Sequence, residues 1–273
     1  MASSSSSSST SSGLIRATVA FDILGTCFSL DAVIQAVKER YADVLESDEV
    51  NAESFVLDWW HSVQRDYTYL SLVSKHTPIA QIAKSTFPRA LACHFPSLKV
   101  SSESDPSGED VDYVMGKLKS LTPVDGLKEA LKVLKDGGVE VWAVSNGAKA
   151  TTESYLDQAS LLSLFTGGII SCDEIPSPFS SSSAQGIAKP HPTVYQHART
   201  QLLASQPAKP TWFIAAHAWD LLGAREEGFR CGWSKSHEKV WPYDGFDVGG
   251  RFDVEGATVE EVAKGLVRCL DQM

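Results

Sequence analysis

The spacing of hydrophobic residues changes twice along this chain and divides it into three stretches. Residues 17–21 form a continuous apolar run, which is typical of a parallel strand that is buried on both faces. Over residues 28–118 the apolar positions recur at three- and four-residue intervals, and no segment alternates convincingly as a strand would. This spacing predicts helices over residues 28–45, 52–73 and 79–95, and the polar residues 101–110 predict a loop.

From Pro123 onward short apolar runs alternate with helical patterns. The runs predict strands at 139–144, 168–171, 212–216 and 230–233, and the patterns predict helices at 125–135, 151–162, 192–203, 218–227 and 259–270. A Pro- and Ser-rich loop is expected at 176–185. Strands that alternate with helices predict an α/β fold with a parallel sheet and right-handed crossovers. We therefore expect a core formed by residues 14–27 and 119–273, with residues 28–118 inserted as a helical cap.

The composition restricts the partners of this chain. Its 273 residues are 43% hydrophobic and carry a net charge of −10, so the chain can bury a sizeable core but presents an acidic surface. Such a surface disfavours nucleic acid and anionic membranes, and no apolar run approaches membrane-spanning length. We expect a small-molecule substrate and no nucleic-acid or membrane partner, with a homodimer as the candidate assembly.

The cysteines and the N-terminal residues bear on location. The five cysteines are scattered and include no C-x-x-C pair, which fits reduced thiols better than a disulfide framework or a zinc site. Residues 1–13 are nearly all serine and threonine and predict a disordered tail. They lack the apolar segment of a secretory signal and the arginines of a transit peptide. We therefore expect a cytoplasmic protein.

Polar clusters follow three of the predicted strands. Their sequences are Asp22-x-x-Gly25-Thr26, Ser145-Asn146-Gly147 and His217-Ala218-Trp219-Asp220. Lys189 lies just before the helix between the second and third strands of this set. Because the carboxyl ends of parallel strands meet at one edge of a sheet, the topology brings two carboxylates, a hydroxyl and an amine together. Taken singly, the Ser-Asn-Gly cluster also suits an ordinary turn and Lys189 a solvated charge. Their joint occurrence favours an active site.

These motifs resemble those of the haloacid dehalogenase superfamily, in particular its L-2-haloacid dehalogenase-like (type II) branch. The resemblance extends from about residue 18 to residue 232 and includes Gln64-x-x-Tyr67-Thr68-x-Leu70, which is similar to the cap helix of that branch. It implies a Rossmann-like core beneath a helical cap and a hydrolase that acts at carbon. In such enzymes the first aspartate, here Asp22, displaces a leaving group and forms an aspartyl ester that water then cleaves.

The resemblance also implies roles for the other motif residues. Lys189 would neutralise and orient Asp22, and Asp220 would organise the charges and assist the attack of water. The side chains that would position the nucleophile or bind a substrate carboxylate are Thr26, Ser145 and Asn146. The side chains expected around the substrate or beside Lys189 are His61, Tyr67, His217, Tyr195 and Trp60, although the aromatic rings of the cap also suit ordinary packing.

Four positions depart from the family pattern. Phosphatases of the superfamily have a second aspartate two residues after the nucleophile, but this chain has Leu24, which cannot transfer a proton. We therefore expect neither phosphate-ester hydrolysis nor an essential metal or other cofactor. His61 stands where a cap arginine would hold the departing halide, and Ala215 and His217 replace a serine and an asparagine. Without this guanidinium to bind the halide, we do not expect a standard enzyme for short 2-haloacids.

Two other functions stay open. Two histidines beside Asp22 would suit acid-assisted opening or rearrangement of an epoxide in specialised (secondary) metabolism, since an imidazolium can protonate the epoxide oxygen. A non-catalytic binding or scaffold protein is the third reading, if His61, Ala215 and His217 mark a decayed site. The retained Asp22 and Lys189 argue against decay.

Overall fold

The computed structural model describes residues 14–98, 108–178, 186–245 and 251–273. The expected serine-rich tail at residues 1–13 and parts of the expected loops at 101–110 and 176–185 lie outside these ranges. Among the described residues, no helix combines the length and the apolar character needed to cross a membrane.

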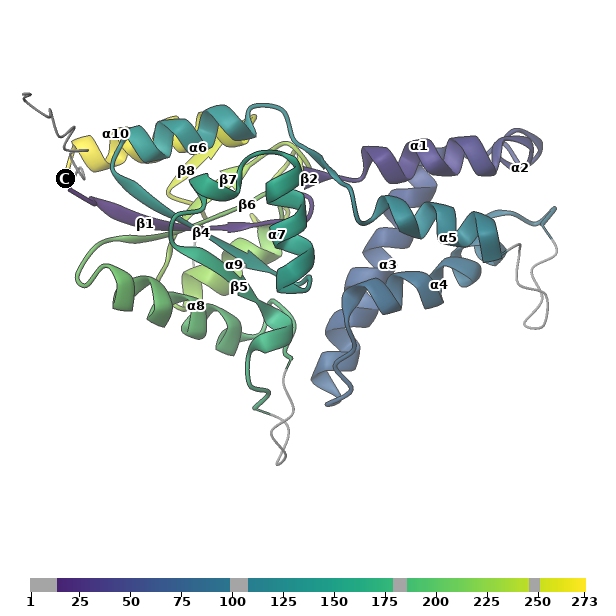
Figure 1. The fold of residues 1–273 in the computed structure, drawn as a ribbon, viewed down its shortest axis with the longest axis horizontal. Helices are drawn as coiled ribbons and strands as arrows, with labels where there is room; N and C mark the ends of the chain where they lie inside the picture. Colours follow the sequence, from purple (N-terminus) through teal and green to yellow (C-terminus); the bar gives the residue numbers. More distant parts are fainter. Residues whose placement is uncertain (1–13, 99–107, 179–185, 246–250) are drawn as a thin grey trace, which may run out of the picture.

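Six parallel strands form the central sheet (Figure 1). Their order is β5 (Gly168–Ser171), β4 (Val139–Ser145), β1 (Ala17–Asp22), β6 (Thr211–Ala215), β7 (Arg230–Ser234) and β8 (Val254–Gly256). In β1, Asp22 lies opposite Val144 of β4, and Phe21 lies opposite Ile214 of β6. Every residue of β1 is buried, which explains its continuous apolar run. The predicted α/β class with a parallel sheet is confirmed.

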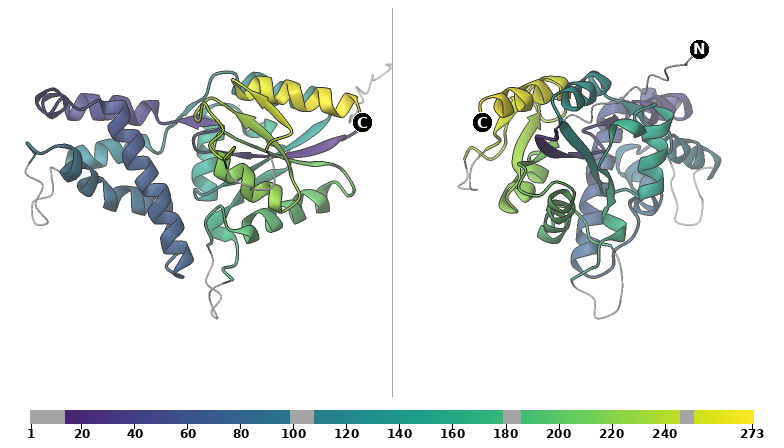
Figure 2. Two further views of the ribbon diagram at one scale, coloured as in Figure 1. Left: turned by 180° about the vertical axis from the view of Figure 1, so that it is seen from behind. Right: turned by 60° about the vertical axis from the view of Figure 1, so that its left-hand side comes forward.

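Helices cover both faces of this sheet (Figures 1 and 2). On one face α6 (Leu127–Asp136) packs against α10 (Val259–Asp271), and on the other lie α8 (Pro192–Ser205) and α9 (Ala218–Glu226). α7 (Lys149–Gln158) contacts β5, and two short 3₁₀ turns cover Leu162–Leu164 and Cys172–Glu174. Successive side chains of β1 point to opposite faces, so Phe21 joins one hydrophobic core and Ala20 the other.

Between residues 31 and 117 the chain leaves the sheet, and the part that the structure describes forms five helices, here called the helical insert. They are α1 (Asp31–Arg40), α2 (Ala42–Ser47), α3 (Ala52–Leu72), α4 (Ile79–His94) and α5 (Gly108–Lys117). All five lie to one side of the sheet, beyond the end of β1 that carries Asp22 (Figure 1). The strands β2 (Phe28–Ser29) and β3 (Thr122–Pro123) pair antiparallel where the chain enters and leaves the insert.

Several boundaries differ from the predictions. The helix predicted over 28–45 is divided into three elements. Residues 28–29 pair with β3 and form β2, and Tyr41, at φ −122° and ψ 22°, separates α1 from α2. Residues 108–110, expected in a loop, already belong to α5. Strands β2, β3 and β8 were not predicted, since two or three residues are too few to show an alternating pattern.

Candidate active site

Three charged side chains meet at the carboxyl edge of the sheet. Asp22 ends β1, Asp220 lies in the first turn of α9, and Lys189 comes shortly before α8. Lys189 Nζ donates to Asp22 Oδ1 and to Asp220 Oδ2, at 2.6 Å in each case, and to the carbonyl of Val144 at 3.3 Å. The exposed fractions of Asp22, Lys189 and Asp220 are 5%, 1% and 0%. The lysine ammonium therefore bridges two buried carboxylates.

Burial and charge act on these groups in opposite directions. Burial by itself would raise the pKa of Asp22, but the charge of Lys189 and the nearby His217 ring hold that pKa well below its usual range. Burial would lower the pKa of Lys189, but the charges of Asp22 and Asp220 raise it above its usual value. Burial raises the pKa of Asp220, because the favourable charge of Lys189 does not fully compensate. At neutral pH Asp22 is thus a carboxylate held against a permanent ammonium.

Neutral side chains fix the orientation of both carboxylates. Thr26 Oγ1 donates to Asp22 Oδ2 at 2.7 Å and accepts from the backbone N–H of Ala216 at 2.8 Å, so its hydroxyl joins the β1 turn to the end of β6. The hydroxyl of Tyr195 on α8 donates to Asp220 Oδ1 at 2.5 Å. A Cβ at Gly223 would lie 2.5 Å from Tyr195 Cε2, so the glycine lets the Tyr195 ring pack closely against α9. Tyr195 therefore contacts Asp220, the carboxylate that is paired with Lys189.

The end of β4 and the residue after it supply two more polar side chains. Asn146 Oδ1 accepts from the backbone N–H of Lys189 at 3.0 Å and so helps place the start of the lysine side chain. Ser145 Oγ accepts from the N–H of Gly147 at 2.9 Å, which closes the turn after the strand. Ser145 also lines a cavity between the insert and the core. These contacts bring both predicted residues to the site.

His217 lies directly beside Asp22. Its Nδ1 is 3.7 Å from Asp22 Oδ2, and its side chain is almost completely buried. The ring passes over Gly25, where a Cβ would come within 2.6 Å of His217 Cε1. Gly25 also has φ +88°, in the left-handed region that favours glycine. A side chain at residue 25 would therefore crowd the imidazole that lies beside the carboxylate.

Two further histidines extend away from His217. The His237 ring, in the segment after β7, lies 4.7 Å from the His217 ring, and the His61 ring on α3 lies 6.0 Å from His237, measured between centroids. His61, predicted around the substrate, is exposed and turned toward His237. His237 was missed by the sequence reasoning, because it belongs to no motif and is simply one of seven histidines.

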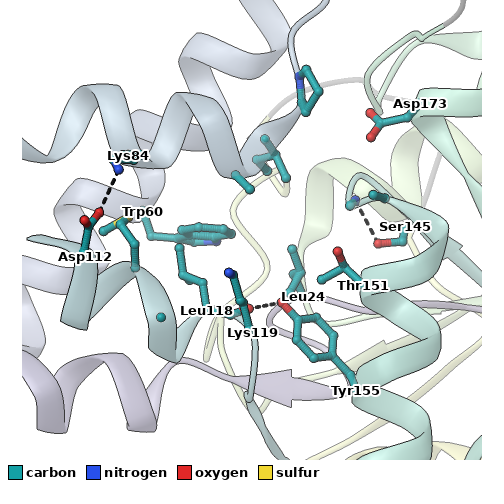
Figure 3. A pocket seen from close by; sticks show the side chains of 17 residues that line it. Leu24, Trp60, Lys84, Asp112, Leu118, Lys119, Ser145, Thr151, Tyr155 and Asp173 are labelled. Atoms are coloured by element: carbon teal, nitrogen blue, oxygen red, sulfur yellow. Dashed lines mark hydrogen bonds and ion pairs between the residues drawn. The ribbon is translucent and has the colours of Figure 1, made fainter.

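Two cavities lie near the carboxyl edge of the sheet. One of about 380 Å³ separates the insert from the core (Figure 3), and Asp22 itself lines a second of about 10 Å³ with Asn146 and His217. Leu24, Trp60 and Ile79 line both cavities. In Figure 3 the Trp60 ring projects from the insert toward Leu24. Trp60 therefore forms part of the wall between the nucleophile and the larger space.

The end of α3 is fastened to the segment that carries Lys189. Ser71 Oγ accepts from the N–H of Ala188 at 2.9 Å, and Thr68 Oγ1 donates to the carbonyl of Lys189 at 3.3 Å. Tyr67 is fully buried on the same helix and packs edge-on against His76, with ring centroids 5.2 Å apart. Tyr67, expected around the substrate, is thus placed in the packing of the insert.

Known proteins with similar sequences and folds support a family assignment. The chain resembles (S)-2-haloacid dehalogenase 2 of Pseudomonas sp. (strain CBS-3), at 24% identity over 217 residues that cover 79% of this chain and 82% of the relative. It also resembles haloacetate dehalogenase H-2 of Moraxella sp. (strain B), at 23% identity over 215 residues that cover 79% and 84%. The solved structure of L-2-haloacid dehalogenase from Xanthobacter autotrophicus shares the fold, with a TM-score of 0.71 at 18% identity, covering 93% of this chain and 99% of that one.

A family model describes most of the chain directly. The model for haloacid dehalogenase-like hydrolases matches residues 17–228, which include Asp22, Lys189 and Asp220. Those residues also include the first strand, the helical insert and the strands that carry the site. The chain is therefore an enzyme of the hydrolase type and belongs to the haloacid dehalogenase-like hydrolase family.

Proposed function

We propose that this hydrolase acts at a carbon centre of a small organic molecule through an ester formed on Asp22. The observation that carries the proposal is the bridge from Lys189 to Asp22, because it keeps a buried carboxylate ionised and fixed in orientation. A carboxylate held in this way is a workable nucleophile. The family membership is consistent with the same chemistry.

The proposed reaction has two steps. A carboxylate oxygen of Asp22 bonds to the substrate carbon, and the leaving group departs with the bonding electrons. Water then cleaves the ester and restores the carboxylate. Thr26 and Lys189 hold one oxygen of Asp22 each, which limits its rotation during the first step. The Lys189 charge also stabilises negative charge that develops during ester cleavage, while Asp220 holds the ammonium in place.

We infer that the helical insert is a cap over the site, with residues 28–118 as the cap and residues 14–27 and 119–273 as the core. Trp60 and Ile79 support this inference, because both come from the insert and line the small cavity at Asp22. A cavity of about 10 Å³ holds no organic substrate. Movement of the insert would join the two cavities and expose Asp22 to the substrate.

The substrate is expected to be larger than a short 2-haloacid. The cavity of about 380 Å³ falls within the range of roughly 300–1,000 Å³ that is usual for drug-sized ligands. Its lining is mainly apolar and includes Leu118 and Ile79, with hydroxyls from Ser145 and Thr151. His61, where the resemblance expects an arginine, is exposed and supplies no guanidinium to a departing halide.

Phosphate-ester hydrolysis remains disfavoured. Leu24 lines the cavities where a phosphatase would have a second aspartate, and its apolar side chain cannot donate a proton to a leaving alkoxide. The Lys189 ammonium lies between the carboxylates of Asp22 and Asp220, so the positive charge there comes from the protein itself. Among the described residues, no group of three or more His, Cys, Asp or Glu side chains is placed to hold a metal ion.

A second candidate function is the opening or rearrangement of an epoxide. The observation that favours it is the position of His217 Nδ1, 3.7 Å from Asp22 Oδ2. A protonated imidazole there would supply a proton to an epoxide oxygen while Asp22 attacks or stabilises the carbon. Such a substrate would belong to specialised metabolism.

One isotope experiment tests the proposal. Wild-type protein is given a short 2-haloacid panel, 2-bromo-3-phenylpropanoate and styrene oxide in ¹⁸O-water, with Asp22→Asn as the control. Single-turnover label in the Asp22 carboxylate, together with halide or diol product, supports the ester. Label in the product alone, or an isomerised epoxide without added oxygen, rejects it and favours direct water attack or rearrangement. Wild type and Asp22→Asn proteins that are equally inert would favour the scaffold reading.

Two further expectations concern the protein as a whole. We infer a cytoplasmic location, and the five free cysteines among the described residues support it. A homodimer remains a prediction that sedimentation equilibrium would test.

A further inference from the structure

Three imidazole rings lie in succession between solvent and Asp22. His61 is exposed on α3, and its ring centroid is 6.0 Å from that of His237. The His237 ring lies 4.7 Å from the His217 ring, and His217 Nδ1 lies 3.7 Å from Asp22 Oδ2. The series begins on the insert, passes through the segment after β7 and ends beside the nucleophile.

The inner ring of this series is buried with one nitrogen unsatisfied. His217 is 3% exposed, and among the described residues no group forms a hydrogen bond with its Nδ1. Buried polar atoms of this kind are rare in folded proteins unless a ligand, a water or a catalytic function accounts for them. The atom faces Asp22 Oδ2, so a water molecule that attacks an Asp22 ester would lie within its reach.

A separate cavity lies beside the two inner rings, those of His217 and His237. Its volume is about 220 Å³, and both His217 and His237 line it together with the polar side chains of Asp31, Glu53 and Ser236. This volume exceeds what a water molecule needs, about 30 Å³ of liquid volume each, and the lining offers several hydrogen-bonding groups. Water can therefore bridge the two rings where they do not touch directly.

The charges around the rings suit transfer of a proton toward solvent. Burial, followed by the charges of His217, His61 and Lys239, lowers the pKa of His237 to about 4, against a smaller opposing effect of Asp22. His237 is therefore neutral at pH 7 and holds a proton only briefly. Asp22 of β1, which is paired with Lys189, and His237 after β7 face the His217 ring. Glu238 accepts from the backbone N–H of the next residue, Ala218.

We propose that His217 takes the proton from the water that cleaves the Asp22 ester, and that His237 and His61 pass protons between His217 and solvent. The inference rests on the ester chemistry proposed above. Substrate would then approach through the cavity of about 380 Å³, and protons would leave through the cavity of about 220 Å³ on the histidine side. His217 would be a catalytic residue, and His237 and His61 would act through it.

The water oxygen bonds to the ester carbonyl carbon while one water proton moves to His217 Nδ1. The bond from that carbon to the product oxygen then breaks, and His217 returns the proton to this oxygen, which gives the alcohol. The new Asp22 carboxyl group loses the second water proton through His217 and His237, because Lys189 favours the carboxylate. One proton reaches solvent in each turnover.

The proton path can be tested in the resting enzyme without a substrate. Nuclear magnetic resonance of ¹⁵N-histidine-labelled protein gives the exchange rate of the His217 ring proton with water, with the signal assigned by its loss in His217→Asn. We expect His237→Phe to slow this exchange at least tenfold and His61→Gln to slow it less. The control is His197→Phe, a half-buried histidine on α8 that lines a different cavity. An unchanged exchange rate in folded His237→Phe overturns the relay.

A second measurement separates the relay from the ester chemistry. With 2-bromo-3-phenylpropanoate, His217→Gln should still form the Asp22 ester but cleave it roughly 10²–10⁴ times more slowly than wild type, as expected when a general base is lost. Intact-mass measurement would show the ester accumulating. Equal cleavage rates in wild type and His217→Gln reject His217 as the base and leave the Asp22 proposal standing. If Asp22 is never esterified, the use of the relay in ester cleavage is overturned together with the proposed function.

Discussion

Lys189 Nζ lies 2.6 Å from Asp22 Oδ1, and both side chains are almost completely buried. Removing one partner of such a pair leaves a charge without water or a counter-ion, which typically costs about 3–5 kcal/mol. Here the same ammonium also neutralises Asp220, so its loss leaves two adjacent carboxylates. The stability of the core and the ionisation of the nucleophile therefore depend on one side chain.

We expect Lys189→Met to lower the free energy of unfolding by about 3–5 kcal/mol at pH 7, because both carboxylates lose their counter-ion. The deficit should shrink near pH 4, where the carboxylates can take up protons. Urea unfolding at both pH values measures it. The control is Lys84→Met, since Lys84 forms an exposed pair with Asp112 and should lose under about 1 kcal/mol. Equal losses for the two variants would contradict the buried bridge.

The raised pKa of Lys189 also sets an alkaline limit to stability. Burial lowers this pKa, but the larger combined effect of Asp22 and Asp220 raises it above the ordinary value of about 10.4. The ammonium therefore stabilises the fold fully below that value and loses its contribution as the pH rises through the higher folded-state pKa. We expect wild type to lose more stability above pH 10.5 than Lys189→Met, measured by urea unfolding. If both proteins lose stability equally as the pH rises, the raised pKa of Lys189 is refuted.

We expect the hydroxyl group of Thr26 to be important for stability and its methyl group to be dispensable. Thr26→Val leaves the Ala216 N–H without an acceptor and Asp22 Oδ2 without a donor. An unsatisfied buried group costs about 1–3 kcal/mol, so the midpoint temperature of thermal unfolding should be lower in Thr26→Val than in wild type. Thr26→Ser keeps the hydroxyl and should retain most of the stability and most of the rate of Asp22 ester formation. A valine variant as stable and active as the serine variant would show that this contact is dispensable.

Trp60 should control access to Asp22. Trp60→Ala removes part of the wall between the cavities, and the lost packing should cost about 3–5 kcal/mol. If the wall limits access, KM for 2-bromo-3-phenylpropanoate should fall in this variant while KM for a short 2-haloacid changes little. Tyr69→Ala, on the exposed face of the same helix, is the control and should change neither by much. A KM change shared by both substrates would indicate a general disturbance of the insert.

The sequence was sufficient for the architecture and for the charged centre. Asp22 and Ser145 end strands, and Asp220 lies in the first turn of the helix after β6. Because the carboxyl ends of parallel strands share one edge, their meeting follows from topology. The continuous apolar run of β1 likewise indicates a strand that is buried on both faces of the sheet. Hydrophobic periodicity and polar residues at the ends of elements are local features, so they can be recognised in a single sequence.

Only the tertiary structure revealed what reaches the site from elsewhere. His237 belongs to no motif, and its contact with His217 depends on the path of the chain after β7. The wall formed by Leu24 and Trp60 joins residues from the core and the insert, and the two-residue strands β2 and β3 exist only because they pair with each other. Contacts between distant segments depend on packing in three dimensions, which hydrophobic spacing along one chain does not encode.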